Sequence, residues 1–244
     1  MDFHCHLDLY TQPREVHRQA VLRNEFTWLV TTSPKAFAAT SAALLHSDKV
    51  LISPGLHPEI AGQRAIELNL LLEQMAHCKG VGEVGLDGSA RYKASYAVQQ
   101  SIFAAVVARS AELGGRVLSI HSRAAASDVV RELARHPTFG VAVMHWFSGS
   151  ISELRNATSM GCWFSVGPAM FASANCRRLV AAMPKDRVVP ESDGPFAQID
   201  GEPLMPWCED RTVELLSAAW KCSKDEAANN LRENSRQLRQ LMVD

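Results

Sequence analysis

Short apolar runs alternate with amphipathic segments along almost the whole chain. The runs predict eight strands, at residues 2–7, 27–32, 50–55, 80–86, 116–121, 141–145, 162–166 and 187–192. The clearest helical pattern between them covers residues 94–113, where Val98, Ile102 and Val106 recur at helical spacing. Strands that alternate with helices favour a parallel sheet, and eight is the number that closes a barrel. We therefore expect an α/β protein with a TIM-like (β/α)8 barrel, and an open doubly wound sheet is the alternative.

The last helix is expected to begin at Ser223-Lys224-Asp225-Glu226, which is a capping-box pattern. Its predicted buried face carries Ala227, Leu231, Leu238 and Leu241. No linker, repeat or low-complexity run interrupts the sequence, so we expect a single domain over residues 1–244.

Composition and charge narrow the classes of function. The chain is 47% hydrophobic and its formal net charge is −1, which argues against a protein that coats duplex DNA but permits a local pocket for a strand end. The six cysteines are scattered without a Cys-x-x-Cys pair, so we expect free thiols in a reducing compartment. No secretory signal or membrane-spanning run is present in the sequence, and the expectation is a cytoplasmic protein without a membrane partner.

Six side chains that can bind metals lie at or near the ends of predicted strands. His4 and His6 are two residues apart on the first strand, so both imidazoles should face the same side of the sheet. The full set of candidates is His4, His6, Glu83, His121, His145 and Asp193. In a barrel the chemistry lies where the strands end, and four imidazoles with two carboxylates suit a pair of divalent ions. The predicted site is therefore a metal site at the C-terminal rim. The other histidines, His17, His46, His77 and His136, lie on predicted helices or at their ends and are expected to face solvent.

The order of these motifs resembles the TatD family of metal-dependent deoxyribonucleases, within the amidohydrolase-like barrels. The matching segments are Asp2-Phe3-His4-Cys5-His6-Leu7-Asp8, Gly55-Leu56-His57-Pro58, Val81-Gly82-Glu83-Val84-Gly85-Leu86-Asp87, Ile120-His121-Ser122-Arg123, His145-Trp146-Phe147-Ser148-Gly149 and Glu191-Ser192-Asp193-Gly194-Pro195. The resemblance implies a TIM-like barrel and a centre of two divalent metal ions (Mg, Mn or Zn) held by the six candidates. Residues 161–168 and the stretch after Leu86-Asp87 look closest to a TatD-like branch associated with Qat-type anti-phage defence, which would imply protein partners from the same operon.

These observations predict a nuclease that hydrolyses single-stranded DNA or other nucleic-acid ends through a water activated by two metals. Asp193 would be a ligand and the general base, and Glu83 would bridge the two ions. His57, Arg123 and Trp146 follow strand ends in the matching motifs and are the candidates for substrate binding: the guanidinium for a phosphate and the indole for a base.

One segment departs from the family pattern. Residues 196–203 carry no Lys or Arg and include Asp200 and Glu202, although the family usually has a basic residue here. If this loop lies beside the metals, the two carboxylates would repel a phosphate backbone. The departure keeps two alternatives open: a small-molecule hydrolase of the amidohydrolase type, and a metal-binding subunit of a larger defence complex.

Overall fold

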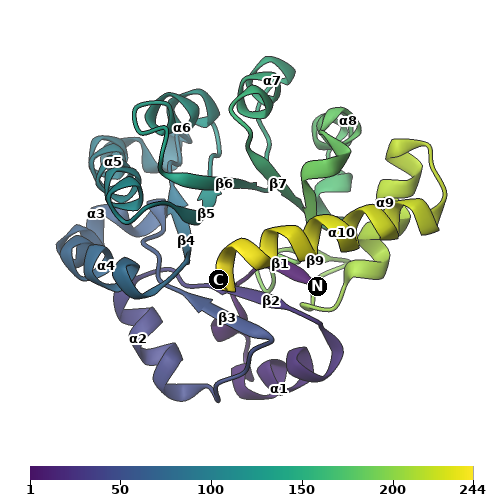
Figure 1. Ribbon diagram of the computed structural model, residues 1–244, viewed down its shortest axis with the longest axis horizontal. Helices are drawn as coiled ribbons and strands as arrows, with labels where there is room; N and C mark the ends of the chain where they lie inside the picture. Colours follow the sequence, from purple (N-terminus) through teal and green to yellow (C-terminus); the bar gives the residue numbers. More distant parts are fainter. Residues whose placement is uncertain (244) are drawn as a thin grey trace.

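Eight parallel strands surround a common axis and helices pack around their outside in the computed structural model, which describes residues 1–243 (Figure 1). The strands are β1 (Asp2–Cys5), β2 (Thr27–Val30), β3 (Val50–Ser53), β4 (Gly80–Gly85), β5 (Arg116–His121), β6 (Gly140–His145), β7 (Trp163–Val166) and β8 (Val188–Pro190). All eight predicted strands are present, and their ends differ from the predicted ones by at most two residues. The TIM-like barrel is confirmed.

The barrel closes through two seams. Backbone hydrogen bonds connect neighbouring strands in two sheets, one with the order β1-β2-β3 and the other with the order β4-β5-β6-β7-β8. At the first seam the Thr31 N–H donates to the Gly82 carbonyl (3.0 Å) and the Glu83 N–H donates to the Thr31 carbonyl (3.1 Å). At the second seam the Asp193 N–H donates to the His4 carbonyl (2.9 Å). Both seams therefore hold residues of the predicted site in place.

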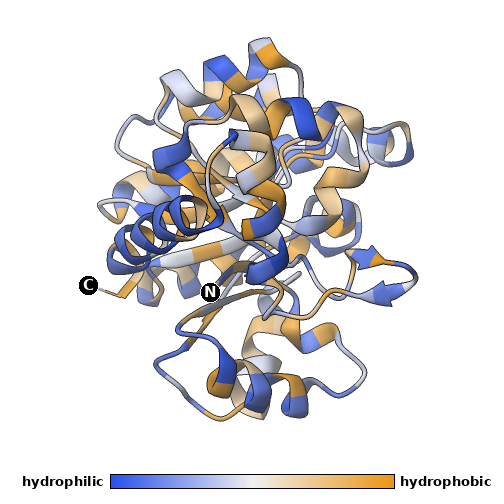
Figure 2. Cartoon of the chain, turned by 90° about the vertical axis from the view of Figure 1, so that its right-hand side faces the viewer, coloured by the Kyte–Doolittle hydropathy of each residue, from blue (hydrophilic) through white to orange (hydrophobic). Residues whose placement is uncertain are grey.

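Helices follow the strands in chain order and turn their apolar faces to the barrel, so hydrophilic and hydrophobic stretches alternate along them (Figure 2). They are α1 (Pro13–Arg23), α2 (Pro34–Ala43), α3 (Ala61–Arg64), α4 (Leu68–Gln74), α5 (Tyr96–Glu112), α6 (Ala126–Leu133), α7 (Ile151–Ser159), α8 (Ala174–Ala182), α9 (Glu209–Trp220) and α10 (Lys224–Val243). The helix predicted at residues 94–113 is α5, and a 3₁₀ segment, Ala90–Ser95, leads into it.

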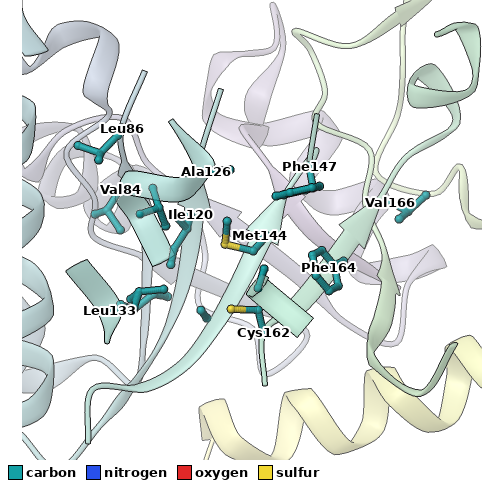
Figure 3. Packing of buried hydrophobic residues seen from close by; sticks show 14 of the residues in the cluster. Val84, Leu86, Ile120, Ala126, Leu133, Met144, Phe147, Cys162, Phe164 and Val166 are labelled. Atoms are coloured by element: carbon teal, nitrogen blue, oxygen red, sulfur yellow. The ribbon is translucent and has the colours of Figure 1, made fainter. Parts of the chain in front are cut away.

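The core has two layers because side chains alternate along each strand. Outward side chains such as Met144 and Phe164 pack with residues of the surrounding helices, including Leu133 of α6 (Figure 3). Inward side chains fill the barrel, and Leu238 and Met242 of α10 join them. A Cβ added at Gly80, the first residue of β4, would lie 3.2 Å from Met242 Cε, so α10 covers the end of the barrel opposite to the strand C-termini.

Two predictions of burial were wrong. Leu241 is 48% exposed, and Met242, one position later on α10, is buried in its place. His17 was expected to face solvent, but it is buried in α1. The six cysteines are free thiols, as expected. No helix within residues 1–243 combines the length and apolarity needed to cross a membrane.

Residues 196–203, the segment that departs from the family pattern, include a small hairpin. β9 (Gln198–Ile199) pairs antiparallel with β10 (Glu202–Pro203). Asp200 and Gly201 connect them with φ values of 55° and 84°, the conformation of a two-residue type I′ turn, which Asp-Gly favours. Asp200 and Glu202 are exposed on this hairpin and are not part of the cavity wall at the strand ends, whereas Phe196, just before the hairpin, is.

Candidate metal centre

The six predicted ligands converge at the C-terminal ends of the strands. His4 lies on β1 and His6 follows its end, Glu83 lies on β4, His121 and His145 are the last residues of β5 and β6, and Asp193 follows β8. All except His4 line one cavity of about 710 Å³, and His4 is completely buried beneath it. The structure thus brings together side chains that are up to 189 positions apart in the sequence.

Glu83 lies at the middle of this group. Its Oε2 is 3.1 Å from His6 Nε2, 3.4 Å from His4 Nε2 and 3.1 Å from His57 Nε2. Its Oε1 is 2.8 Å from His121 Nδ1. The two oxygens of one carboxylate therefore face different imidazoles, which is the arrangement expected of a bridging ligand.

Asp193 approaches the group from the opposite seam. Its Oδ1 lies 3.7 Å from His4 Nε2, 3.9 Å from His6 Nε2 and 4.0 Å from His145 Nε2. The rings of His4 and His145 stack with their centroids 3.6 Å apart and their planes 7° from parallel. Among residues 1–243, four groups of three side chains have ligand atoms within 4.8 Å of one another, and these include His4–His145–Asp193, His4–His6–Glu83 and His57–Glu83–His121.

Three of the imidazoles, those of His4, His145 and His121, are oriented by neighbours that were not predicted as site residues. His4 Nδ1 contacts Ser119 Oγ at 2.7 Å, and His145 Nδ1 contacts Glu191 Oε2 at 2.8 Å. His121 is turned the other way, because its Nε2 contacts Asp87 Oδ2 at 2.9 Å. Such contacts fix the tautomer and the direction of a metal-binding histidine.

Asp87 and Glu191 both lie in the quoted motifs, four positions after Glu83 and two positions before Asp193. Their position at strand ends was the available signal. A carboxylate that binds an imidazole and one that binds a metal look the same in a sequence, so only the fold separates the two roles.

The donor set fits a divalent metal. His4 Nε2 is buried without a hydrogen-bond partner in the described part of the chain, although Glu83 Oε2 lies 3.4 Å away. A buried nitrogen without a partner costs free energy unless some group takes its lone pair. Neutral imidazole and carboxylate together are the ligands of Zn, Mn and related ions.

The imidazoles of the cluster differ in the direction in which their pKa values are shifted. Burial acts to lower the pKa of His145, but Glu191 and Asp193 outweigh it and raise that pKa to about 10. Burial opposes protonation of His121 as well, and its bonds to Asp87 and Glu83 raise its pKa to about 9. For His4, burial and the nearby charge of His145 hold the pKa well below its usual range, which leaves a neutral ring.

The pKa values of the two carboxylic acids in the cluster are also shifted in opposite directions. Burial raises the pKa of Asp193 to about 6, against the opposite effect of His145 and His6. Burial also works to raise the pKa of Glu83, but His57 and the other facing imidazoles hold it well below its ordinary value. Glu83 is therefore an anion throughout the neutral pH range.

The three candidates for substrate binding all line the cavity. His57 is closer to the centre than the sequence suggested, since its Nε2 contacts Glu83 and its Nδ1 accepts the Glu59 N–H. Arg123 is exposed at the mouth, and its guanidinium has no ion-pair or hydrogen-bond partner among residues 1–243. Trp146 is half-buried, with its ring centroid 6.4 Å from that of His145.

Comparison with known proteins shows which family the chain is similar to. The family model described as TatD related DNase matches residues 1–240. An uncharacterized metal-dependent hydrolase of Haemophilus influenzae is 28% identical over 184 residues, which is 71% of this chain and 70% of that protein. The 3'-5' ssDNA/RNA exonuclease TatD of Erwinia amylovora is 28% identical over 177 residues, covering 68% of this chain and 66% of that protein.

A protein with a known crystal structure has a similar fold. The crystal structure of YjjV, a TatD homologue from Escherichia coli, superimposes with a TM-score of 0.81 at 21% identity, covering 97% of this chain and 96% of that one. The family model spans nearly the whole chain and the barrel matches throughout. The chain therefore belongs to the TatD related DNase family of metal-dependent hydrolases.

Proposed function

We propose that residues 1–244 form one hydrolase domain that cleaves phosphodiester bonds at the ends of single-stranded nucleic acid with the help of two divalent ions. The observation that carries the proposal is the position of Glu83, whose two oxygens face His4, His6 and His57 on one side and His121 on the other. The exonuclease named among the relatives supports the choice of substrate class.

The residues sort into those that would hold metal and those that would handle the substrate. His4, His6, Glu83, His121, His145 and Asp193 are the proposed ligands of Mg, Mn or Zn. Metal ions bound there supply Lewis acidity, which lowers the pKa of water and offsets negative charge on a phosphate.

The remaining steps belong to the protein's own side chains. Asp193, at the cavity wall, is the proposed base that accepts a proton from the attacking water. The free guanidinium of Arg123 binds a phosphate oxygen pair, and Trp146 offers a face to a base. His57, beside Glu83, is placed to donate to a phosphate or to complete the ligand set.

The test is digestion of end-labelled single-stranded DNA in Mg or Mn, by the wild type and by His145→Ala. A matched control is His46→Ala, which changes an exposed histidine outside the cavity. We expect a shortening ladder with the wild type and the control, and none with His145→Ala. An intact label with all proteins would contradict the proposal.

A second candidate function is hydrolysis of a small ester, amide or phosphoester. It is favoured by the wall of the cavity, where Arg123 is the one Lys or Arg among the residues described there. Turnover of a small ester or amide without any ladder on DNA would select this alternative.

The role in anti-phage defence is proposed on the resemblance of residues 161–168 and of the stretch after Leu86-Asp87. Its test is plaque formation on cells that carry the neighbouring genes with either the wild type or His145→Ala. Equal plaque numbers would remove the role in defence, and co-purification of an operon product with an inactive wild-type chain would identify a binding subunit instead.

A further inference from the structure

A large apolar side chain stands exposed beside the candidate metal centre. Phe196 is 60% exposed and lines the cavity. Its ring meets the ring of His6 edge to face, with centroids 5.0 Å apart and planes at 74°. Most of the Phe196 side chain is therefore accessible to a ligand, while its ring contacts a proposed metal ligand.

The segment that carries Phe196 is anchored on both sides. The next residue, Ala197, is buried, and its N–H donates to the Asp193 carbonyl (2.9 Å). The Leu204 N–H closes the hairpin onto the Ala197 carbonyl (2.9 Å), and the Tyr10 hydroxyl donates to the Leu204 carbonyl. Phe196 is thus exposed although hydrogen bonds hold its loop in place and the next residue, Ala197, is buried.

The cavity wall includes exposed apolar side chains, whereas its carboxylates Glu83 and Asp193 are buried. Leu9 is 43% exposed and lines the same cavity as Phe196, together with the partly buried Ile60 and Trp146. Glu83, Asp193 and four histidines line the same cavity. Such a site suits a ligand with a flat apolar part next to one anionic group, and it suits a long run of phosphates poorly, since Arg123 is the single cationic side chain besides histidine in the described wall.

We propose that Phe196 is the platform on which the terminal nucleobase of the substrate stacks, so that cleavage is faster when the end nucleotide carries a base but does not depend on which base it is. The inference rests on the proposed nuclease function. Stacking on an aromatic ring tolerates every base because each has a π-face. Phe196 has no polar atom with which to distinguish base edges, so it reads the presence of a base and not its identity.

The two cavity aromatics approach the centre from different strand ends. Phe196 follows β8 and contacts His6, whereas Trp146 follows β6 and lies next to His145. With Phe196 holding the terminal base, Trp146 and Arg123 remain for the second nucleotide and its phosphate. The arrangement predicts release of mononucleotides from an end.

The experiment compares oligonucleotides that differ only in their terminal nucleotide. One set of oligonucleotides ends in each of the four bases, and the other set ends in an abasic nucleotide. Each set is made twice, once with the varied nucleotide at the 3′ end and once with it at the 5′ end. We expect the wild type to prefer base-bearing ends about tenfold in kcat/KM, at one end only, with little difference among the four bases; stacking of one base is worth about 1–3 kcal/mol.

Phe196→Ala should abolish that preference by slowing the base-bearing ends, and Phe196→Trp should restore it. Ile66→Ala, which removes a side chain that is 90% exposed outside the cavity, is the matched control and should keep the preference. The dissociation constants of the same oligonucleotides from metal-free protein, measured by fluorescence anisotropy, should change in parallel.

The outcomes separate the two proposals. Cleavage of DNA with the same preference in Phe196→Ala, or with equal losses on base-bearing and abasic ends, overturns the role of Phe196 and leaves the nuclease function standing. Absence of any cleavage by the wild type overturns the nuclease function and this inference with it.

Discussion

Asp87 Oδ2 contacts His121 Nε2 at 2.9 Å, and this contact directs His121 Nδ1 toward Glu83, 2.8 Å away. His4 and His145 are held by their Nδ1 atoms and present Nε2 to the centre. Histidines of neighbouring strands therefore use different ring nitrogens, and the partner of each ring decides which one.

Asp87→Ala should weaken divalent-metal binding about 10–100-fold, because the His121 ring loses the group that fixes its orientation. Titration calorimetry with Mn or Zn measures the change. Circular dichroism should be unaltered, since the substitution leaves the strands intact. Glu112→Ala, which removes an exposed carboxylate on α5, is the control and should bind metal as the wild type does. Equal affinities for both variants would show that Asp87 does not orient the ring.

Asp193→Asn should reduce turnover about 10²–10⁴-fold while most of the metal remains bound. The amide keeps an oxygen near His4 and His6, but it cannot accept a proton from water. Metal analysis and initial rates on labelled DNA give the two readouts. Asp48→Asn, at an exposed position, serves for comparison. Turnover that survives the change would remove Asp193 from the chemistry.

The metal-free protein should lose stability as the pH rises from about 6.5 to 10. The pKa values of His121 and His145 are raised from 6.5 to about 9 and about 10, against the effect of burial, by Asp87 and Glu83 for the first and by Glu191 and Asp193 for the second. The folded state therefore retains protons that the unfolded state releases, and this contribution is complete below pH 6.5 and is lost through the folded pKa values. Urea unfolding in a chelator at pH 6, 8 and 10 measures the decline.

Bound metal should reverse this dependence. Metal ligands must be neutral imidazoles, so binding releases protons and the affinity for metal rises over the same pH range. A metal-free protein whose stability is constant or increases from pH 6.5 to 10 would show that these imidazoles are not protonated in the folded state.

Gly194→Ala should destabilise the fold by about 1–3 kcal/mol, the usual cost of overpacking. A Cβ at this position would overlap the Tyr10 hydroxyl and the Leu204 carbonyl. Because Gly194 lies between Asp193 and Phe196, activity should fall as well. The free energy of unfolding is compared with that of Gly62→Ala, where the nearest heavy atom to a new Cβ is Ser95 Cβ at 3.1 Å. Similar values for the two variants would exclude a tight contact at Gly194.

The strands and the placement of the six donors were predictable because both depend on short-range pattern. An apolar run of strand length and the two-residue alternation of His4 and His6 are visible in a few consecutive residues. Asp200-Gly201 is also a short-range signal, which favours a two-residue hairpin turn, although residues 196–203 were expected only to form a loop that repels phosphate.

The burial of individual side chains on helices was harder to predict. On α10, Leu241 and Met242 are both apolar, and the exact rotation of the helix on the barrel decides which of them is covered. His17 is buried on α1 for the same kind of reason. Spacing gives a face about 100° wide and does not set its edges.

The sequence by itself determined an α/β barrel with imidazoles and carboxylates at the strand ends. Only the tertiary structure decided that the barrel closes through seams at Thr31 and Asp193, that Asp87, Glu191 and Ser119 orient the imidazoles, and that Phe196 stands exposed beside them. The physical reason is range: strand formation and side-chain alternation follow from neighbouring residues, whereas ring orientation depends on hydrogen bonds between strands whose pairing is fixed when the barrel closes.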